Sequence, residues 1–390
     1  MRVIHIAQSI AGGVGTYLDE IAACQLKSEG TEDIFFVVPE GSAEYLPFVS
    51  PKQTITFPSL GRTPLGLLVF GAVALKAIKT LDPAIVHLHS SFAGAVVRPM
   101  LALRPARPRI VYCPHGWAFG MEVGAVKKQF YCLCERILAA LTDVIIVNSD
   151  AEHTLGQRYH IPASKMRTIK NGIAPGYGAK PKVWPRDEGC LDLIFIGRHD
   201  RQKGLDILLR EIGHAGCENI RLHVVGKPVL GGSLPVPQIP KNVKFYGWLS
   251  RADIFEMLPR MDALVMPSRW EAFGLTAIEA MRSGIPVIAS NRGALPEVVR
   301  HGLDGLIVDI NRPGELGRVL AGLDRAELKK FGKVARARFR AEFTSDRMNH
   351  LIETLYRWVL ATSRQPVAAA AIPARRSALR RRGTFPRERA

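Results

Sequence analysis

The chain has few cysteines, and they are scattered. Its 390 residues contain six, of which only Cys132 and Cys134 lie close together. The single residue between these two is not the usual spacing of a zinc or redox site. Free thiols in a reducing cytoplasm explain such a distribution best, so we expect a cytoplasmic protein.

Long hydrophobic runs are also missing. The longest, residues 65–75, is about half the length of a membrane span. Residues 1–7 are apolar, but they are few and His5 interrupts them, which predicts a first strand and not a signal peptide. We therefore expect no transmembrane helix, and any membrane contact is expected to be peripheral.

Acidic residues are outnumbered, with 35 Asp and Glu against 53 Lys and Arg and a formal net charge of +18. Such a basic surface implies acidic partners: nucleic acid, anionic lipid or phosphorylated substrates. Nucleic acid is the weakest of these, because the sequence shows no basic helix interleaved with aromatic residues and no zinc-ligand spacing. We expect no nucleic-acid partner.

Short β-branched runs alternate with longer helical patterns, and the alternation occurs twice. One series of strand-like runs lies in residues 3–147 and a second in residues 191–289. Residues 173–185 between them are rich in proline and glycine. The pattern predicts an α/β protein with two Rossmann-like domains that face each other across a cleft, with ligands between them.

The expected boundaries are 1–175 for the first domain, 176–345 for the second and 346–361 for a C-terminal helix. Residues 362–390 form a basic tail, in which residues 363–390 hold eight arginines and one acid, Glu388. The tail has no apolar period and is predicted to be disordered. Its partner is either an anionic membrane surface or nothing.

The most informative motif contains two carboxylates eight positions apart. Glu271 follows an apolar strand, and Glu279 lies about two helical turns later, so both can face one crevice. Backbone N–H groups at a helix start between them would attract anions and hydroxyl oxygens; they belong to Phe273, Gly274 and Leu275. Such a site could grip a sugar that carries a nucleotide diphosphate. The alternative is that both acids lie on a solvated helix face.

A basic turn follows the first strand of the second half. Arg198 ends this strand and Lys203 precedes a helix that begins near Leu205. Two fixed cations at the mouth of a cleft suit a diphosphate and could take up its charge as it leaves. The alternative is a solvated basic turn, which Gly197 and Gly204 disfavour because they imply close backbone approach.

The first half holds weaker candidates at strand ends. Gly12 and Gly13 would let backbone amides approach a phosphate or sugar, although they also suit a tight turn. His115 follows a strand and precedes a glycine, which favours a site role over a structural one. Polar residues that read singly as turns or helix caps are Asn148, Ser149 and Asn171.

Taken in order, these motifs resemble one family. Gly-Gly-x-Gly, His-Gly, Asn-Gly-Ile, Gly-Arg…Lys-Gly and Glu-x7-Glu resemble the retaining glycosyltransferases of family 4, over about residues 1–360. The Glu-x7-Glu segment with Pro296-Glu297 after it is the most specific part. The glycine loop departs from the pattern, because many relatives carry an acidic residue where Val14 and Thr16 stand. The resemblance implies the GT-B fold, with the C-terminal helix crossing back to the first domain.

The resemblance also implies roles. Gly13, with Gly12 beside it, would lie under the phosphates and sugar of the donor, and His115 would contact the transferred sugar near its reactive carbon. Arg198 and Lys203 would hold the diphosphate. No Asp-x-Asp motif follows a strand, so neither a metal nor another cofactor is expected.

In the second half, Glu271 and the amides of residues 273–275 would bind sugar hydroxyls, and Glu279 would bind the ribose. Asn171 joins the donor-binding set, and residues 245–249 would border the base. The family lacks a placed carboxylate nucleophile. The implied route is front-face attack, in which the departing phosphate accepts the proton of the acceptor.

The acceptor is expected in the first half. Residues 62–79 and 96–109 combine apolar side chains with only basic charges. They predict a peripheral contact with anionic lipid beside a lipid-diphosphate acceptor, or else core helices with snorkelling cations.

We therefore expect a cytoplasmic retaining hexosyltransferase, either free or attached peripherally to the inner face of the cell membrane. It would move a hexose from a UDP- or GDP-hexose to a polyprenyl-diphosphate-linked oligosaccharide in exopolysaccharide or surface-glycan synthesis. The alternatives are a nucleotide-sugar epimerase of GT-B architecture and a non-catalytic nucleotide-sugar-binding protein.

Overall fold

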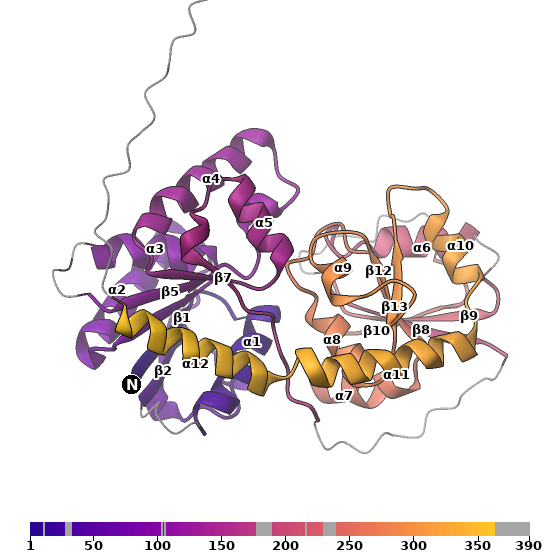
Figure 1. Ribbon diagram of the computed structural model, residues 1–390, viewed down its shortest axis with the longest axis horizontal. Coiled ribbons are helices and arrows are strands. Elements are labelled where there is room, and N and C mark those ends of the chain that lie inside the picture. Colours follow the sequence, from indigo (N-terminus) through magenta and orange to yellow (C-terminus); the bar gives the residue numbers. More distant parts are fainter. Residues whose placement is uncertain are drawn as a thin grey trace, which may run out of the picture.

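The computed structural model describes residues 1–362 apart from residues 11, 28–32, 103, 105–106, 177–188, 215–216 and 229–238. Two parallel sheets flanked by helices form two domains that lie side by side (Figure 1). The 7-stranded sheet has the order β3-β2-β1-β4-β5-β6-β7, and the 6-stranded sheet has the order β10-β9-β8-β11-β12-β13. The α/β, GT-B architecture expected from the sequence is confirmed. The predicted tail lies outside the described residues, apart from Thr362.

The central strands are the apolar runs seen in the sequence. The first sheet contains β1 (Arg2–Ala7), β2 (Asp33–Pro39), β3 (Thr54–Phe57), β4 (Ile85–His89), β5 (Arg109–Cys113), β6 (Val144–Val147) and β7 (Met166–Thr168). The second contains β8 (Leu191–Ile196), β9 (Ile220–Val225), β10 (Val243–Gly247), β11 (Ala263–Met266), β12 (Val287–Ser290) and β13 (Gly305–Val308). Strands β3, β7 and β13 were not predicted from the sequence. All three are short strands at the edges of their sheets; β3 and β7 mix polar and apolar residues, whereas β13 is the four-residue run Gly-Leu-Ile-Val.

The helices cover both sheets. In the first domain they are α1 (Gly13–Gln25), α2 (Pro64–Leu81), α3 (Ser91–Ala102), α4 (Ala125–Ala140) and α5 (Asp150–Arg158). In the second they are α6 (Leu205–His214), α7 (Arg251–Met257), α8 (Leu275–Arg282), α9 (Leu295–Val298), α10 (Glu315–Ala321) and α11 (Arg325–Glu342). Several begin with a side-chain cap on a backbone N–H, at Thr63, Ser149, Ser250, Asp324 and Thr344.

The last helix, α12 (Ser345–Ala361), crosses back from the second domain to the first (Figure 1). Ile173 and Thr344 form a parallel bridge at the crossing. Met348, Ile352 and Tyr356 then pack in a buried cluster with the strands of the first sheet. The helix thus ties the two domains together.

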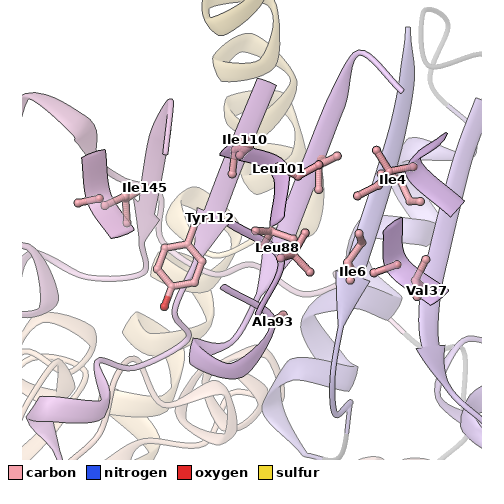
Figure 2. Close-up of a cluster of buried hydrophobic side chains, with 14 of the residues drawn as sticks. Ile4, Ile6, Val37, Leu88, Ala93, Leu101, Ile110, Tyr112 and Ile145 are labelled. Atoms are coloured by element: carbon pink, nitrogen blue, oxygen red, sulfur yellow. The ribbon is translucent and has the colours of Figure 1, made fainter. Parts of the chain in front are cut away.

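The core of the first domain lies between the sheet and its helices. Figure 2 shows Ile4 and Ile6 of β1 beside Val37 of β2, with Leu88 of β4 next to them. These side chains are fully buried, and Leu101 reaches the same layer. Continuous burial of both faces is what parallel strands require.

Helix α2 is long and apolar enough to cross a membrane by length and composition alone, with a mean hydropathy of 1.6 over 18 residues. It nevertheless contributes Phe70, Ala74 and Ile78 to the core. Leu65 and Leu68 near its start are exposed. One face of α2 thus packs in the core of the first domain, and part of the other face is exposed.

A buried ion pair joins α3 to α4. Arg98 is 0% exposed, and its guanidinium donates to Oε2 of Glu135 at 2.8 Å and to the carbonyl oxygen of Gly94 at 2.8 Å. The hydroxyl of Tyr112 donates to Oε1 of Glu135 at 2.7 Å. Both oxygens of the carboxylate are therefore satisfied.

We predict that Arg98→Met lowers the free energy of unfolding by about 3–5 kcal/mol, because it leaves the Glu135 carboxylate buried without its partner. Chemical denaturation measures the change. The control is Arg357→Met, which removes an ion pair whose arginine is 62% exposed and should cost about 1 kcal/mol or less. Equal losses in the two variants would contradict the prediction.

Candidate functional site

The candidate site lies between the domains, where loops from both sheets meet. Ser149, after β6, donates a hydrogen bond from Oγ to the carbonyl oxygen of Ala272 at 3.0 Å. A Cβ placed on Gly116, after β5, would lie 3.3 Å from Cβ of Ala272. A Cβ on Gly13 would lie 3.5 Å from Cδ1 of Leu275. The carboxyl edge of the first sheet therefore borders the loop after β11.

An ion pair joins two of the predicted site residues. Lys203 Nζ donates to Oε2 of Glu271 at 2.6 Å, although the residues are 68 positions apart. Their side chains are only 19% and 11% exposed, so each charge needs the other. A donor diphosphate could share the lysine, which would free the carboxylate for sugar hydroxyls.

Two glycines make this approach possible. A Cβ on Gly204 would lie 2.1 Å from the carbonyl oxygen of Pro267, and one on Gly293 would lie 2.1 Å from that of Glu271. Both have positive φ angles, of 71° and 55°. The role of Gly204 was expected from the sequence. Gly293 was missed, and its only signal is its place after β12.

Arg198 lies on the same turn as Lys203 and is more accessible. Its guanidinium donates to Oε1 of Gln202 at 3.0 Å and pairs with Asp200 at 3.1 Å. The side chain is 45% exposed. Arg198 is thus a second cation on the turn that carries Lys203, and its side chain is exposed enough to contact a ligand.

Glu279 occupies a different environment from Glu271. It is 8% exposed, and burial raises the pKa of its carboxyl, against the opposing charges of Arg251 and Arg282. Arg251 also pairs with Glu20 of α1 at 2.6 Å. The two glutamates therefore do not lie on a solvated helix face. Glu279 lies near the junction with α1, and its role toward the ribose stays a prediction.

The start of α8 provides the expected backbone groups. Gly274 has φ 94° and precedes the helix, and among the described residues no side chain caps it. Phe273 is 3% exposed and packs in the core, so only its backbone is available to a ligand. The uncapped helix start is thus available to an anion or a hydroxyl oxygen.

His115 has a left-handed backbone with φ 52° and is held on both ring nitrogens. Its Nε2 lies 3.0 Å from Nδ1 of His89, and its Nδ1 lies 3.4 Å from Nδ2 of Asn148. Burial lowers the pKa of His115 to about 3, so the ring is neutral. Sequence reasoning did not connect His89 with this residue, because the contact is tertiary.

Glu152 braces the turn that carries His115. Its Oε2 accepts a hydrogen bond from the backbone N–H of Asn148 at 2.9 Å, and Trp117 Nε1 donates to its carbonyl oxygen at 2.9 Å. Burial raises the pKa of the Glu152 carboxyl to about 7. This residue was also missed, since an acid in the first turn of a helix is an ordinary feature.

The remaining predicted residues lie at the margins of the site. Gly12 has φ 72° and precedes α1. Asn171 is buried beside the crossing, where a Cβ on Gly172 would lie 2.1 Å from the carbonyl oxygen of Thr344. The glycine of the Asn-Gly-Ile motif therefore allows the chain before α12 to pack closely against this segment.

Glu297 ties the domains together beside the site. Its carboxylate accepts hydrogen bonds from the backbone N–H groups of Asp150, at 2.8 Å, and of Ala151. These groups begin α5, where the helix dipole favours a negative charge. From the sequence, Glu297 was recognisable only as part of a family motif, without a role of its own.

Within the described ranges, one group of side chains lies close enough to share a metal ion. It comprises His5, His87 and His89, whose ligand atoms are within 4.8 Å of one another. All three are fully buried in the first domain. They lie apart from the Lys203–Glu271 pair.

Comparisons with known proteins decide the family. Residues 11–176 match the family described as Glycosyltransferase Family 4, and residues 191–323 match Glycosyl transferases group 1. The chain belongs to the group 1 glycosyltransferases. The family expected from the motifs is therefore confirmed, as is glycosyltransferase activity.

A protein of 41.2 kDa in the cps region of Klebsiella pneumoniae is 32% identical to this glycosyltransferase over 330 residues, which cover 82% of this chain and 89% of that protein. Sucrose-phosphate synthase from Thermosynechococcus elongatus has a similar structure, with a TM-score of 0.76 and 22% identity over 93% of this chain and 100% of its own. HepE from Anabaena, solved with UDP and glucose, gives a TM-score of 0.74 and 21% identity over 91% and 99%. At these identities the two structures show a shared fold.

We predict that Glu152 makes stability depend on pH. Its folded pKa of about 7 lies above its ordinary value of 4.5, so the folded state holds an extra proton between these values. The contribution of the protonated Glu152 carboxyl to the free energy of unfolding is complete below pH 4.5 and is lost as the pH rises to 7. Relative to Glu152→Gln, the wild type should lose up to about 1.4 kcal/mol of unfolding free energy per pH unit in this window.

Urea denaturation at pH values on both sides of the window measures the effect. Glu218→Gln, at an exposed position of the second domain, is the control and should keep the wild-type profile. Parallel profiles for the wild type and Glu152→Gln would show that the carboxyl does not titrate in this way.

Proposed function

We propose that this glycosyltransferase moves a hexose from UDP- or GDP-hexose to a polyprenyl-diphosphate-linked oligosaccharide, with retention at the anomeric carbon. The observation that carries the proposal is the shielded pair of Lys203 and Glu271 beside the uncapped start of α8. The relative from a cps region supports a role in exopolysaccharide or surface-glycan synthesis. The complex of HepE with UDP and glucose supports a uridine nucleotide.

The cations act on the leaving group. The donor diphosphate engages Arg198 and Lys203, and their charge stabilises it while the bond from the anomeric carbon to the phosphate oxygen breaks. Glu271, released from part of its ion pair, accepts hydrogen bonds from sugar hydroxyls. Two fixed cations supply the charge that a metal would otherwise provide, so we propose that the reaction needs none.

Retention follows from attack on the face that the diphosphate leaves. The acceptor hydroxyl forms the new bond to the anomeric carbon, and its proton passes to the departing phosphate oxygen. His115 lies on the turn of the first domain that contacts Ala272, where it would border the sugar. In this proposal the carboxylates bind the donor, and the leaving group acts as the base.

The first domain offers a surface for a membrane-bound acceptor. Helix α4 exposes one apolar stripe at helical spacing, with exposed fractions of 85% for Val126, 60% for Phe130, 54% for Leu133 and 53% for Ile137. Lys127 and Lys128 lie on the same helix. Apolar side chains beside cations are suited to an anionic membrane surface, so we propose peripheral attachment at the inner face of the cell membrane.

The segments expected to contact lipid contribute less than α4. Residues 62–79 expose Leu65 and Leu68, but residues 96–109 include the buried Val97, Arg98 and Leu101. In residues 96–109, Val97, Arg98 and Leu101 therefore belong to the core and not to a lipid-contacting surface. Arg98 is an ion-paired core residue and not a snorkelling cation.

We predict that Lys203→Ala and Glu271→Ala each lower kcat by about 100-fold or more, because each removes charge or a hydrogen bond that the transition state uses. Nucleotide release across a panel of UDP- and GDP-sugars, with a lipid-linked acceptor, measures the activity. Lys329→Ala on the exposed face of α11 is the control and should keep wild-type rates.

The same assay separates the alternatives. An epimerase would convert the donor without acceptor, and a binding protein would retain the donor without turnover. Unchanged transfer in both Lys203→Ala and Glu271→Ala would show that the site lies elsewhere.

We predict that the double variant Phe130→Glu/Leu133→Glu lowers binding to anionic vesicles by at least about tenfold, since each lost apolar side chain is worth about 1.5–3 kcal/mol when buried. Vesicle flotation with and without anionic lipid measures the bound fraction. Val334→Glu/Leu351→Glu, on exposed positions of α11 and α12, is the matched control. Binding that is equal in both double variants would exclude α4 as the attachment surface.

A further inference from the structure

A row of histidines crosses the centre of the first sheet. Strands β1 and β4 are parallel neighbours, and their register pairs His5 with His87 and Ala7 with His89. All three histidines are fully buried. His115 follows β5 on the other side of β4. Neither the donor nor the acceptor chemistry proposed above uses His5, His87 or His89.

Three of the rings form one hydrogen-bonded chain that starts at Gln25 on α1. His5 Nε2 lies 3.1 Å from Oε1 of Gln25, His5 Nδ1 lies 3.0 Å from Nε2 of His89, and His89 Nδ1 lies 3.0 Å from Nε2 of His115. The chain ends where His115 Nδ1 faces the amide nitrogen of Asn148 at 3.4 Å.

Burial keeps these rings neutral. It lowers the pKa of His5 to about 4 and that of His115 to about 3, and it holds the pKa of His89 well below its ordinary value. A neutral imidazole has one N–H donor and one acceptor nitrogen. The direction of every hydrogen bond in the chain is therefore linked to that of its neighbours.

With the Gln25 amide oriented so that Oε1 faces His5, this oxygen accepts and His5 donates from Nε2. His5 Nδ1 then accepts from Nε2–H of His89, and His89 Nδ1 accepts from Nε2–H of His115. The free lone pair of His115 is on Nδ1, where the Asn148 amide donates. With the Gln25 and Asn148 amides in these orientations, both ends of the chain give the same tautomer, with the proton on Nε2 in all three rings.

The chain ends at a residue with a left-handed backbone. His115 has φ 52° and Gly116 has φ 113°. A left-handed conformation at a non-glycine residue persists only where its surroundings hold it. A Cβ on Gly116 would meet Ala272 at 3.3 Å, next to Glu271. The turn that carries His115 is therefore packed closely against the loop that carries Glu271.

We propose that His5 and His89 are positioning residues that fix the Nε2–H tautomer and the ring plane of His115, and so hold its turn against the loop that carries Glu271. Their effect on transfer rests on the proposed function. The hydrogen-bonded chain itself does not depend on the proposed function.

A metal ion shared by His5, His87 and His89 would require a different arrangement. A metal ligand must direct a nitrogen lone pair at the ion. In His5 and His89 the lone pair of Nδ1 already accepts a hydrogen bond, and Nε2 carries the proton. Among these three residues, the ring nitrogen with no partner is Nε2 of His87.

The first experiment reads the tautomers directly. In the full-length wild-type protein labelled with ¹⁵N-histidine, NMR spectra should show neutral rings with the proton on Nε2 for His5, His89 and His115. Added Zn²⁺ should leave these signals unchanged. A proton on Nδ1 in His89 or His115, or stoichiometric Zn²⁺ binding that removes the signals of His5 and His89, would overturn the proposal.

The second experiment compares two matched variants. His5 and His87 are register partners with the same burial, but only His5 belongs to the chain. His5→Leu should lower kcat by about tenfold, as misplacement of a site residue does, and should leave the donor KM within about twofold. His87→Leu should keep kcat within about twofold of wild type. His5→Gln, whose amide can both accept and donate, should recover part of the loss.

Thermal unfolding of each variant reports whether it folds. Equal losses of kcat in His5→Leu and His87→Leu would reduce His5 to a structural role. If the wild type shows no transfer with any donor, the proposed function fails, and the NMR spectra still decide whether the chain exists. If His5→Leu does not fold, the spectra of the wild type and of His5→Gln carry the test.

Discussion

The site depends on a charge pair that two distant segments must complete. Lys203 comes from the turn after β8 and Glu271 from the loop after β11, and their side chains meet at 2.6 Å with little access to water. A buried charge without its partner is costly, so neither segment can move alone. Gly204 and Gly293 permit the approach because any Cβ there would meet a backbone carbonyl oxygen at 2.1 Å. The ion pair and the close backbone contacts thus hold the two loops against each other.

The first domain supports this arrangement from the opposite side of the junction. Glu297 accepts hydrogen bonds from the start of α5, and Arg251 pairs with Glu20 of α1 at 2.6 Å. Helix α12 then returns across the crossing at Ile173. These ties join the domains at several points and leave the loops after β5 and β11 in contact. Polar groups at an interface of this kind fix geometry more than they add stability.

The prediction from sequence was strongest where a pattern is local. The central strands are continuous apolar runs, so their existence and order along the chain were readable. The edge strands β3 and β7 were missed because three or four residues of mixed composition carry no such signal, and the four-residue apolar run of β13 was missed with them. Glycines and cations beside strands were predicted as site residues for the same reason. His89, Glu152 and Glu297 were not, since each acts through partners that are remote in the chain.

The sequence by itself determined the fold class, the family and the residue types available to a diphosphate and a sugar. Only the tertiary structure decided that Glu271 pairs with Lys203 while Glu279 lies near Arg251 and Glu20. It also decided that His115 is held by a row of buried rings. Periodicity records which side chains are buried, because burial follows one element at a time. Which charges and hydrogen-bonding groups meet depends on how separate elements pack, and no local pattern contains that information.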